Sequence, residues 1–287
     1  MYYGARLYET VHTHALRVLL VALQSLRGGR NSVRPYQTTI SALRWGGRRA
    51  MHIPTPLGQN RILQGLPAAE LAGMQPHLKQ MQLLQGMVLY HPGDTIEYVC
   101  FPQTGMISLL TVMATGEQVE TGIVGCSGVV GATIGNFGPL AFGQTVVQIA
   151  GTAHQLPRAK FLSLLESSAA LRRLVNEFDG YLYFQAMQSA ACHAVHSVQT
   201  RLCRWILHSQ DTLQSDVIEL TQDSLAHMLG VQRTAVSLCA HQLQVAGLIR
   251  YVRGSIIIID RDGLEQSACE CYDATRRYIQ AMSPTIC

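Results

Sequence analysis

"LTQDSLAHMLGVQRTAVSLCAHQL", residues 220–243, holds two short helical patterns with a glycine between them. Thr221 is suited to cap the first helix, because its hydroxyl can accept a hydrogen bond from a free backbone N–H of the first turn. Gly230 can adopt the positive φ that ends a helix and turns the chain sharply. A second helix starts near Gln232. The spacing therefore predicts a helix-turn-helix in which Gly230 is the turn.

The two predicted helices each have one apolar face, which we expect to be buried at Leu225, Ala226, Leu229, Val236, Cys239, Ala240 and Leu243. The opposite face of the second helix holds side chains that can hydrogen-bond base edges, and Leu238 can touch a thymine methyl. The stretch "AGLIRYVRGSIIIID", residues 246–260, then predicts a strand, a turn and a strand that form a wing against the DNA backbone. The predicted DNA-contacting residues are Thr221, Gln222, Gln232, Arg233, Thr234, Ser237, Leu238, His241, Arg250 and Arg253.

Upstream, residues 81–151 form short runs rich in Val, Ile, Tyr and Thr, separated by turn signals such as Pro92-Gly93-Asp94. This pattern predicts an antiparallel barrel or jelly roll of about eight strands. Two short helices are expected before it, over residues 60–78, with Pro67 opening the second. The fold class is therefore α+β, with an antiparallel barrel or jelly roll at the N-terminal side, a long helix, and a C-terminal winged helix-turn-helix.

After Pro157 the chain has helical periodicity, and one helix of about 25 residues is expected. Its apolar stripe predicts a dimer seam, because a long helix between two compact regions cannot cover such a stripe by itself. Packing of the stripe against its own barrel is the alternative. The predicted dimer-interface residues are Leu171, Leu174, Val175, Phe178 and Leu182.

The first fifty residues have a composition of their own, with eight arginines and a single acid, Glu9. Three interpretations stay open: a disordered basic arm, a targeting peptide, or codons upstream of a true start at Met51. No run in the chain reaches the length of about 18 apolar residues that a membrane helix needs. The predicted divisions are 1–59 for the extension, 60–165 for the barrel, 166–195 for the dimerisation helix, 196–275 for the winged helix-turn-helix and 276–287 for a tail.

Residues 220–272 resemble the winged-helix domain of the Crp/Fnr family of bacterial transcription regulators. "HPGDTIEYVCFPQTGMISLL" (91–110) and "TGEQVETGIVGCSGVVG" (115–131) are similar to that family's cyclic-nucleotide-binding-like barrel. The resemblance covers roughly residues 60–275. It implies a cytoplasmic homodimer that binds double-stranded DNA at a two-fold symmetric operator, with RNA polymerase as an expected further partner.

The ligand that many relatives bind is not expected here. Cyclic-nucleotide-binding members hold the phosphate with Arg and the ribose with Glu, and the matching places in this chain are Gln144 and the neighbourhood of Val130. A neutral amide cannot balance a buried phosphate. The resemblance therefore implies a sensor barrel whose effector is unknown, and cyclic nucleotides are not expected as partners.

No cofactor or metal is expected from the sequence pattern. Residues 51–99 contain no cysteine, so the N-terminal iron–sulfur cluster of the family's oxygen sensors is absent. Cys269 and Cys271 form one CxC pair, too little for a zinc site of four ligands. His77, His91 and His154 are weak candidates for an axial haem ligand.

Three other functions compete with DNA binding. A redox-responsive regulator on the same scaffold would use some of the eight cysteines as sensor thiols. A metal-dependent barrel enzyme would need two His and a carboxylate on one face, yet the barrel has no HxH pair, and "GCSGVVG" is not a nucleophile elbow. A partner-binding or membrane-surface module using the basic arm would leave the winged helix unexplained. The prediction is a DNA-binding regulator and not an enzyme.

Overall fold

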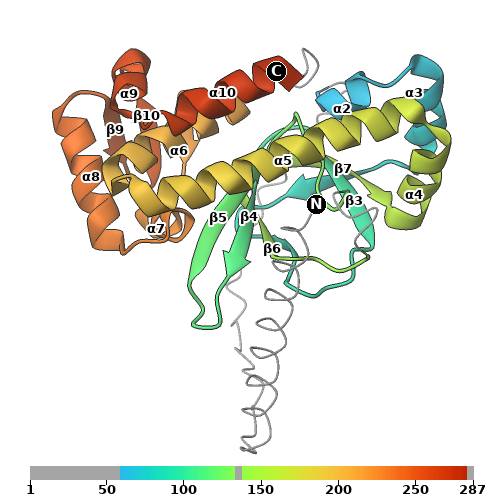
Figure 1. Cartoon of the computed structure of the whole chain (residues 1–287), viewed down its shortest axis with the longest axis horizontal. Helices are drawn as coiled ribbons and strands as arrows, with labels where there is room; N and C mark the ends of the chain where they lie inside the picture. Colours follow the sequence, from blue (N-terminus) through green and yellow to red (C-terminus); the bar gives the residue numbers. More distant parts are fainter. Residues whose placement is uncertain (1–58, 133–137, 283–287) are drawn as a thin grey trace, which may run out of the picture. The chain divides into compact units, whose positions relative to one another are not determined.

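The computed structural model describes residues 59–132 and 138–282, which all lie in one compact unit, Pro54–Cys287 (Figure 1). The predicted extension, residues 1–59, falls outside the described part except for Gln59. The described chain begins with two short helices and a 3-10 turn, and Pro67 precedes the second helix as expected. These elements are α2 (Arg61–Gln64), α3 (Ala68–Met74) and η1 (Gln75–His77).

Two antiparallel sheets follow and confirm the jelly-roll class. One sheet has the strand order β1-β7-β3 and the other the order β2-β6-β4-β5, so the strands do not close into a single barrel. Where about eight strands were expected, the described residues form β1 (Lys79–Leu83), β2 (Val88–Tyr90), β3 (Tyr98–Pro102), β4 (Met106–Val112), β5 (Gln118–Val124), β6 (Gln144–Ile149) and β7 (Gly151–Pro157).

Two helices follow the sheets along the chain. They are α4 (Arg158–Ser167) and the 27-residue α5 (Ala169–Val195). Ser168 caps α5, because its hydroxyl accepts a hydrogen bond from the N–H of Leu171 at 2.9 Å. The predicted long helix therefore exists with nearly the expected length. Figure 1 shows α5 as the long yellow helix that runs past β4 and β5.

The predicted dimer stripe of α5 faces the chain's own jelly roll. Leu171, Leu174, Val175, Phe178 and Leu182 are all buried in one core with side chains of the two sheets. Phe178 packs so closely that a Cβ on Gly128 would lie 2.2 Å from its ring. The interpretation of these five residues as a dimer seam was therefore wrong, because their surface is already covered within one chain.

The C-terminal part is a small sheet surrounded by helices. Its strands have the order β8-β10-β9. The elements are α6 (Val198–Leu213), β8 (Val217–Glu219), α7 (Gln222–Leu229), α8 (Arg233–Val245), β9 (Ile249–Val252), β10 (Ser255–Ile258), α9 (Arg261–Ser267) and α10 (Cys271–Met282). The predicted helix-turn-helix is α7 and α8, and the predicted wing is β9 and β10.

A buried carboxylate joins the C-terminal part to the jelly roll. Glu120 of β5 accepts hydrogen bonds from the Trp205 indole at 2.8 Å and from the Ser108 hydroxyl at 2.5 Å. Burial raises the pKa of Glu120 to about 7, although both hydrogen bonds oppose this rise. Helix α7 also packs against β5. The domain boundaries proposed from the sequence therefore stay predictions within one compact unit.

Candidate functional site

The turn of the helix-turn-helix is built as its sequence predicts. The Thr221 hydroxyl accepts a hydrogen bond from the N–H of Ser224 at 3.1 Å, so it caps α7. Gly230 has φ of 59°, and the N–H of Val231 donates back to the carbonyl of Ala226 at 3.0 Å. The seven residues expected to be buried between the helices are all buried. Because this core holds α7, the opposite face of α8 is presented to solvent.

That face of α8 carries most of the predicted base-reading residues. Gln232 occupies the N-cap position without a capping hydrogen bond from its side chain, and Arg233 and Thr234 are exposed in the first turn. Leu238 and His241 follow on the same face, and Leu238 is 59% exposed although it is apolar. An exposed leucine among polar residues on this face of the helix suits contact with a thymine methyl in the major groove.

Two predicted contact residues are instead engaged with each other. Gln222 and Ser237 are half-buried, and the Ser237 hydroxyl donates to the Gln222 side-chain oxygen at 2.5 Å. They fix α7 against α8 and offer less of their hydrogen-bonding capacity to DNA. Helical periodicity describes each helix separately, so it does not reveal a bond between two of them.

Arg233 also has a partner that periodicity does not reveal. Its guanidinium lies 3.4 Å from the carboxylate of Asp223, at the start of α7, and both side chains are more than half exposed. Exposed pairs of this kind contribute at most about 1 kcal/mol. Arg233 can therefore leave Asp223 and bind a guanine or a phosphate of DNA at little cost in free energy.

The wing is a tight hairpin with its arginines outside. Arg253 and Gly254, with φ of 46° and 83°, form the turn between β9 and β10, and Arg250 is exposed on β9. The Tyr251 hydroxyl donates to the carbonyl of Leu220 at 3.1 Å, immediately before the cap of α7. The wing is thus tied to the helix-turn-helix, and its two arginines are placed to reach DNA phosphates.

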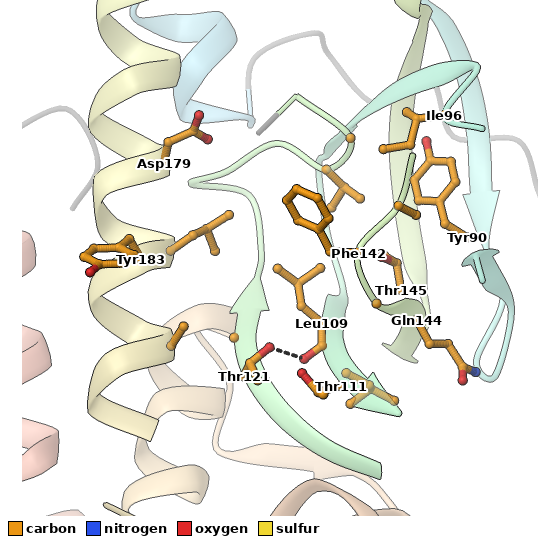
Figure 2. A pocket seen from close by; sticks show the side chains of 18 of the residues that line it. Tyr90, Ile96, Leu109, Thr111, Thr121, Phe142, Gln144, Thr145, Asp179 and Tyr183 are labelled. Atoms are coloured by element: carbon orange, nitrogen blue, oxygen red, sulfur yellow. Dashed lines mark hydrogen bonds between the residues drawn. The ribbon is translucent and has the colours of Figure 1, made fainter. Parts of the chain in front are cut away.

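A large cavity of about 630 Å³ lies between the jelly roll and α5 (Figure 2). Its walls are mostly apolar, with Tyr90, Ile96, Leu109 and Phe142 on the side of the sheets and Leu182 and Tyr183 on α5. A few hydroxyl and amide groups line it, among them Thr111, Thr121, Gln144 and Thr145. Such a cavity fits a small molecule with a mainly apolar surface.

The charge of this cavity does not suit an anion. Among the described residues that line the cavity, the single carboxylate is Asp179, and none is an Arg, Lys or His. Burial raises the pKa of Asp179 to about 7. Gln144 accepts a hydrogen bond from the Gln118 amide at 3.1 Å, and Arg158 donates to the carbonyl of Gly138 at 3.2 Å without lining the cavity.

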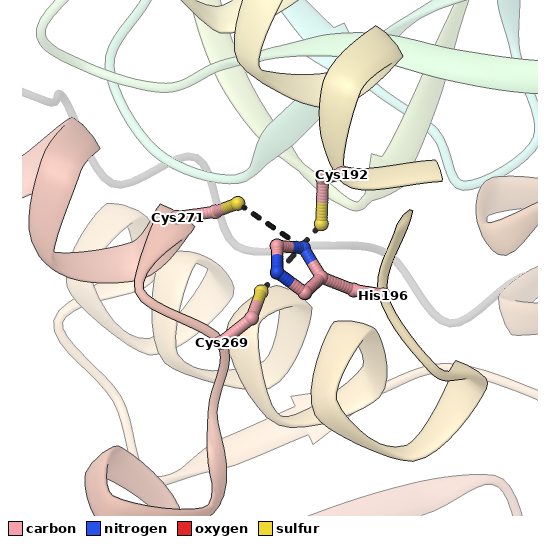
Figure 3. Close-up of side chains that lie close together, drawn as sticks. All are labelled: Cys192, His196, Cys269 and Cys271. Carbon is pink, nitrogen blue, oxygen red and sulfur yellow. Dashed lines mark hydrogen bonds between the residues drawn. The ribbon is translucent and has the colours of Figure 1, made fainter. Parts of the chain in front are cut away.

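Four potential metal ligands meet at the end of α5. They are Cys192, His196, Cys269 and Cys271, and one ligand atom of each lies within 4.8 Å of all the others (Figure 3). In the sequence, the CxC pair of Cys269 and Cys271 offers only two ligands. A zinc site of four ligands was therefore not expected there. The structure adds two more from a segment over seventy residues upstream. The barrel histidines join no such group within the residues described, and His154 is buried in β7.

Known proteins share the C-terminal domain and the fold of this chain. Residues 200–267 match the family model of the Crp-like helix-turn-helix domain. None of the curated proteins compared with the chain matches it. Among solved structures, FixK2 from Bradyrhizobium japonicum has a TM-score of 0.59 at 14% identity, covering 67% of this chain and 98% of its own.

Two further structures agree with this result. A Crp/Fnr-family transcriptional regulator from Thermus thermophilus has a TM-score of 0.56 at 20% identity, covering 66% of this chain and 98% of its own. A Crp/Fnr-family regulator from Eubacterium rectale has a TM-score of 0.56 at 16% identity, covering 72% of this chain and 96% of its own.

The family match identifies the C-terminal domain, and the solved structures identify the fold. The chain contains a Crp-like helix-turn-helix domain, and its described part has the fold of Crp/Fnr regulators. Residues 200–267 therefore belong to the Crp-like helix-turn-helix domains, and the likeness to these three solved structures, at 14–20% identity, shows the fold. Within the described residues, no helix has the length and apolar character needed to cross a membrane.

Proposed function

We propose that this protein binds a two-fold symmetric DNA operator as a homodimer and regulates transcription in response to a small molecule held between the jelly roll and α5. The observation that carries DNA reading is the exposed face of α8, with Arg233, Thr234 and Leu238 beside a wing that presents Arg250 and Arg253. The expected location is the cytoplasm, with RNA polymerase as a further partner. We infer no catalytic role.

The homodimer would form along the outer face of α5. Four exposed residues at helical spacing follow this face, namely Tyr183, Met187, Ala190 and Ala194. Tyr183 and Met187 are 68% and 49% exposed, so two large side chains with apolar surface lie on this one face of the helix. A second copy of α5 would cover this stripe, and the small alanines allow close approach. Two copies would then present two recognition helices to two half-sites.

The effector would be neutral or positively charged. Asp179 and the apolar walls disfavour a phosphate, and an apolar or cationic molecule fits the cavity better. The cavity shares Tyr183 with the proposed dimer stripe. An occupant would therefore contact the helix that joins the two copies, which offers a physical route from effector to DNA-binding domains.

Replacement of Arg233 by alanine should weaken binding to the cognate operator by about 1–3 kcal/mol and relax specificity at one position of each half-site. The reason is loss of a bidentate contact to a base. Arg253→Ala should instead weaken binding to all DNA equally and give a shallower dependence on salt. Fluorescence anisotropy on cognate and random duplexes at several salt concentrations measures both effects.

Asp223→Asn serves as the matched control for the arginine variants. It removes the ion pair of Arg233 and leaves the arginine in place, so binding should stay the same or become slightly tighter. An equal loss on cognate and random DNA for Arg233→Ala would reassign this residue to a phosphate contact.

Cyclic AMP and cyclic GMP should not bind at physiological concentrations. A charge-assisted contact to phosphate contributes about 1.5–3 kcal/mol, and none of the lining residues in the described part of the chain is a cation that could make it. Isothermal titration of each nucleotide into the full chain checks this. A dissociation constant below about 10 μM would contradict it, and Arg158→Ala would then show whether that residue swings in from its bond to Gly138.

A redox-responsive regulator on the same scaffold is the second candidate, and one contact favours it. The sulfur atoms of Cys192 and Cys269 lie 3.5 Å apart, so oxidation could join them in a disulfide. Mass spectrometry of the protein before and after mild oxidation tests this candidate.

A further inference from the structure

We propose that Cys192, His196, Cys269 and Cys271 bind one zinc ion that clamps the helix-turn-helix domain to the end of α5. The four ligands flank the matched domain on both sides, since residues 200–267 lie between His196 and Cys269. Three thiolates and one imidazole are a common ligand set of structural zinc sites. Such a site depends neither on the effector nor on the operator sequence.

Two separations between ligand atoms are close to those around a tetrahedral ion, and all four ligand atoms lie within 4.8 Å of one another. Normal Zn–S and Zn–N bonds place two sulfur ligands about 3.8 Å apart, and a sulfur and a nitrogen about 3.6 Å apart. The Sγ atoms of Cys192 and Cys269 are separated by 3.5 Å, and Cys271 Sγ lies 3.5 Å from His196 Nδ1. An iron–sulfur cluster would need its thiolates farther apart, around a core of several atoms.

The histidine is oriented by a second group, as metal-bound histidines usually are. Nδ1 of His196 lies 3.5 Å from Cys271 Sγ inside the cluster (Figure 3). Its other ring nitrogen, Nε2, lies 3.2 Å from the carboxylate of Glu270. The carboxylate would hold the ring in the tautomer that leaves Nδ1 free to bind a metal. Glu270 sits between the two ligand cysteines, so the CxC loop supplies both the ligands and this support.

The packing of the three cysteines differs from that of the others in the core. Cys100, Cys203 and Cys239 are buried among Val, Leu and Ile side chains, as small apolar residues would be. Cys192, Cys269 and Cys271 instead form a buried cluster of their own, with sulfur next to sulfur. Hydrophobic burial explains the first group, whereas the second group is explained by a shared ligand.

The buried positive charges near the cluster favour a metal site that carries net negative charge. Three thiolates and one Zn²⁺ carry a net charge of −1. Arg201 and Arg204 are buried nearby, and each interacts electrostatically with Cys192. The Nε atoms of both arginines lack a hydrogen-bond partner among the described residues. The zinc site would offset part of their buried positive charge.

The site lies where α5 meets the helix-turn-helix domain, so a bound ion would hold these two parts together. Cys192 lies in the last turn of α5, and His196 follows that helix immediately before Ser197, which caps α6. Cys269 lies in the loop between α9 and α10, and Cys271 is the first residue of α10. Helix α10 then returns along α5, where the rings of Phe184 and Tyr278 stack with centroids 4.2 Å apart. The ion would fix the junction at which the helix-turn-helix domain meets the proposed dimer helix.

Metal analysis of the full chain, purified under reducing conditions without chelator, should find one zinc per chain. Titration of the thiols of this wild-type protein with a mercurial should release that zinc as three thiols react. Cobalt(II) added to metal-free protein should give the intense visible bands of a tetrahedral site and the near-ultraviolet thiolate-to-metal band.

Variants separate this site from adventitious binding. Cys192→Ser and Cys271→Ser should each lose stoichiometric zinc, whereas Cys126→Ser, at a half-buried cysteine outside the cluster, should retain it. Glu270→Gln should fold and bind zinc about tenfold to a hundredfold more weakly. Substoichiometric zinc in the wild-type protein without a thiolate-to-cobalt band would overturn the proposal, and so would an isolated Cys192–Cys269 disulfide without metal.

Discussion

Replacement of Met187 by aspartate is expected to give a folded monomer that loses on the order of a hundredfold or more in affinity for a two-half-site operator. Met187 is 49% exposed on the outer face of α5, so the carboxylate remains solvated in the monomer and the fold survives. In a dimer two such carboxylates would face each other in an apolar seam. Loss of the second half-site contact removes the gain from bivalent binding.

Sedimentation equilibrium and circular dichroism test this prediction together. Native helix content with a monomeric mass is the expected outcome for Met187→Asp. Arg173→Asp, at another exposed position of α5 outside the stripe, is the control and should stay dimeric. A Met187→Asp protein that sediments as a dimer would place the seam on another surface.

Replacement of Phe178 by aspartate is expected to unfold the jelly roll. Phe178 is 1% exposed, and its ring packs against Gly128 and near Tyr181. Removal of a buried phenyl ring costs about 3–5 kcal/mol, and an unpaired buried carboxylate adds to this cost. Because domains are stable by about 5–15 kcal/mol, most of the folded population should be lost.

The conservative variant Phe178→Leu controls for the position and should fold with reduced stability, as urea unfolding would show. If Phe178→Asp folded normally and sedimented as a monomer, Phe178 would lie in the dimer seam after all. The two aspartate variants thus decide which face of α5 meets a second copy.

The helix-turn-helix could be predicted because its determinants are local. Thr221 as a cap, Gly230 at positive φ and apolar residues three and four apart depend on the backbone within a few turns. The wing was likewise predictable from a two-residue turn between short strands. The ion pair between Asp223 and Arg233 was missed because it joins two helices whose relative placement no local pattern specifies.

The orientation of α5 could not be derived from its own pattern. A helix of this composition carries two apolar stripes, one through Phe178 and one through Met187, and periodicity does not say which one the jelly roll covers. The Cys/His cluster was equally hidden. Its members come from segments over seventy residues apart, so only the packing of α10 and its preceding loop beside the end of α5 brings them together.

Selection of binding sites from random DNA with the full-length protein shows whether the chain reads a DNA sequence. We expect enrichment of one two-fold symmetric sequence with half-sites about one helical turn, or 10 base pairs, apart. We further expect that Arg233→Ala relaxes one position in each half-site. Recovery of no preferred sequence, with equal affinity for all duplexes, would contradict the assignment of a sequence-specific regulator.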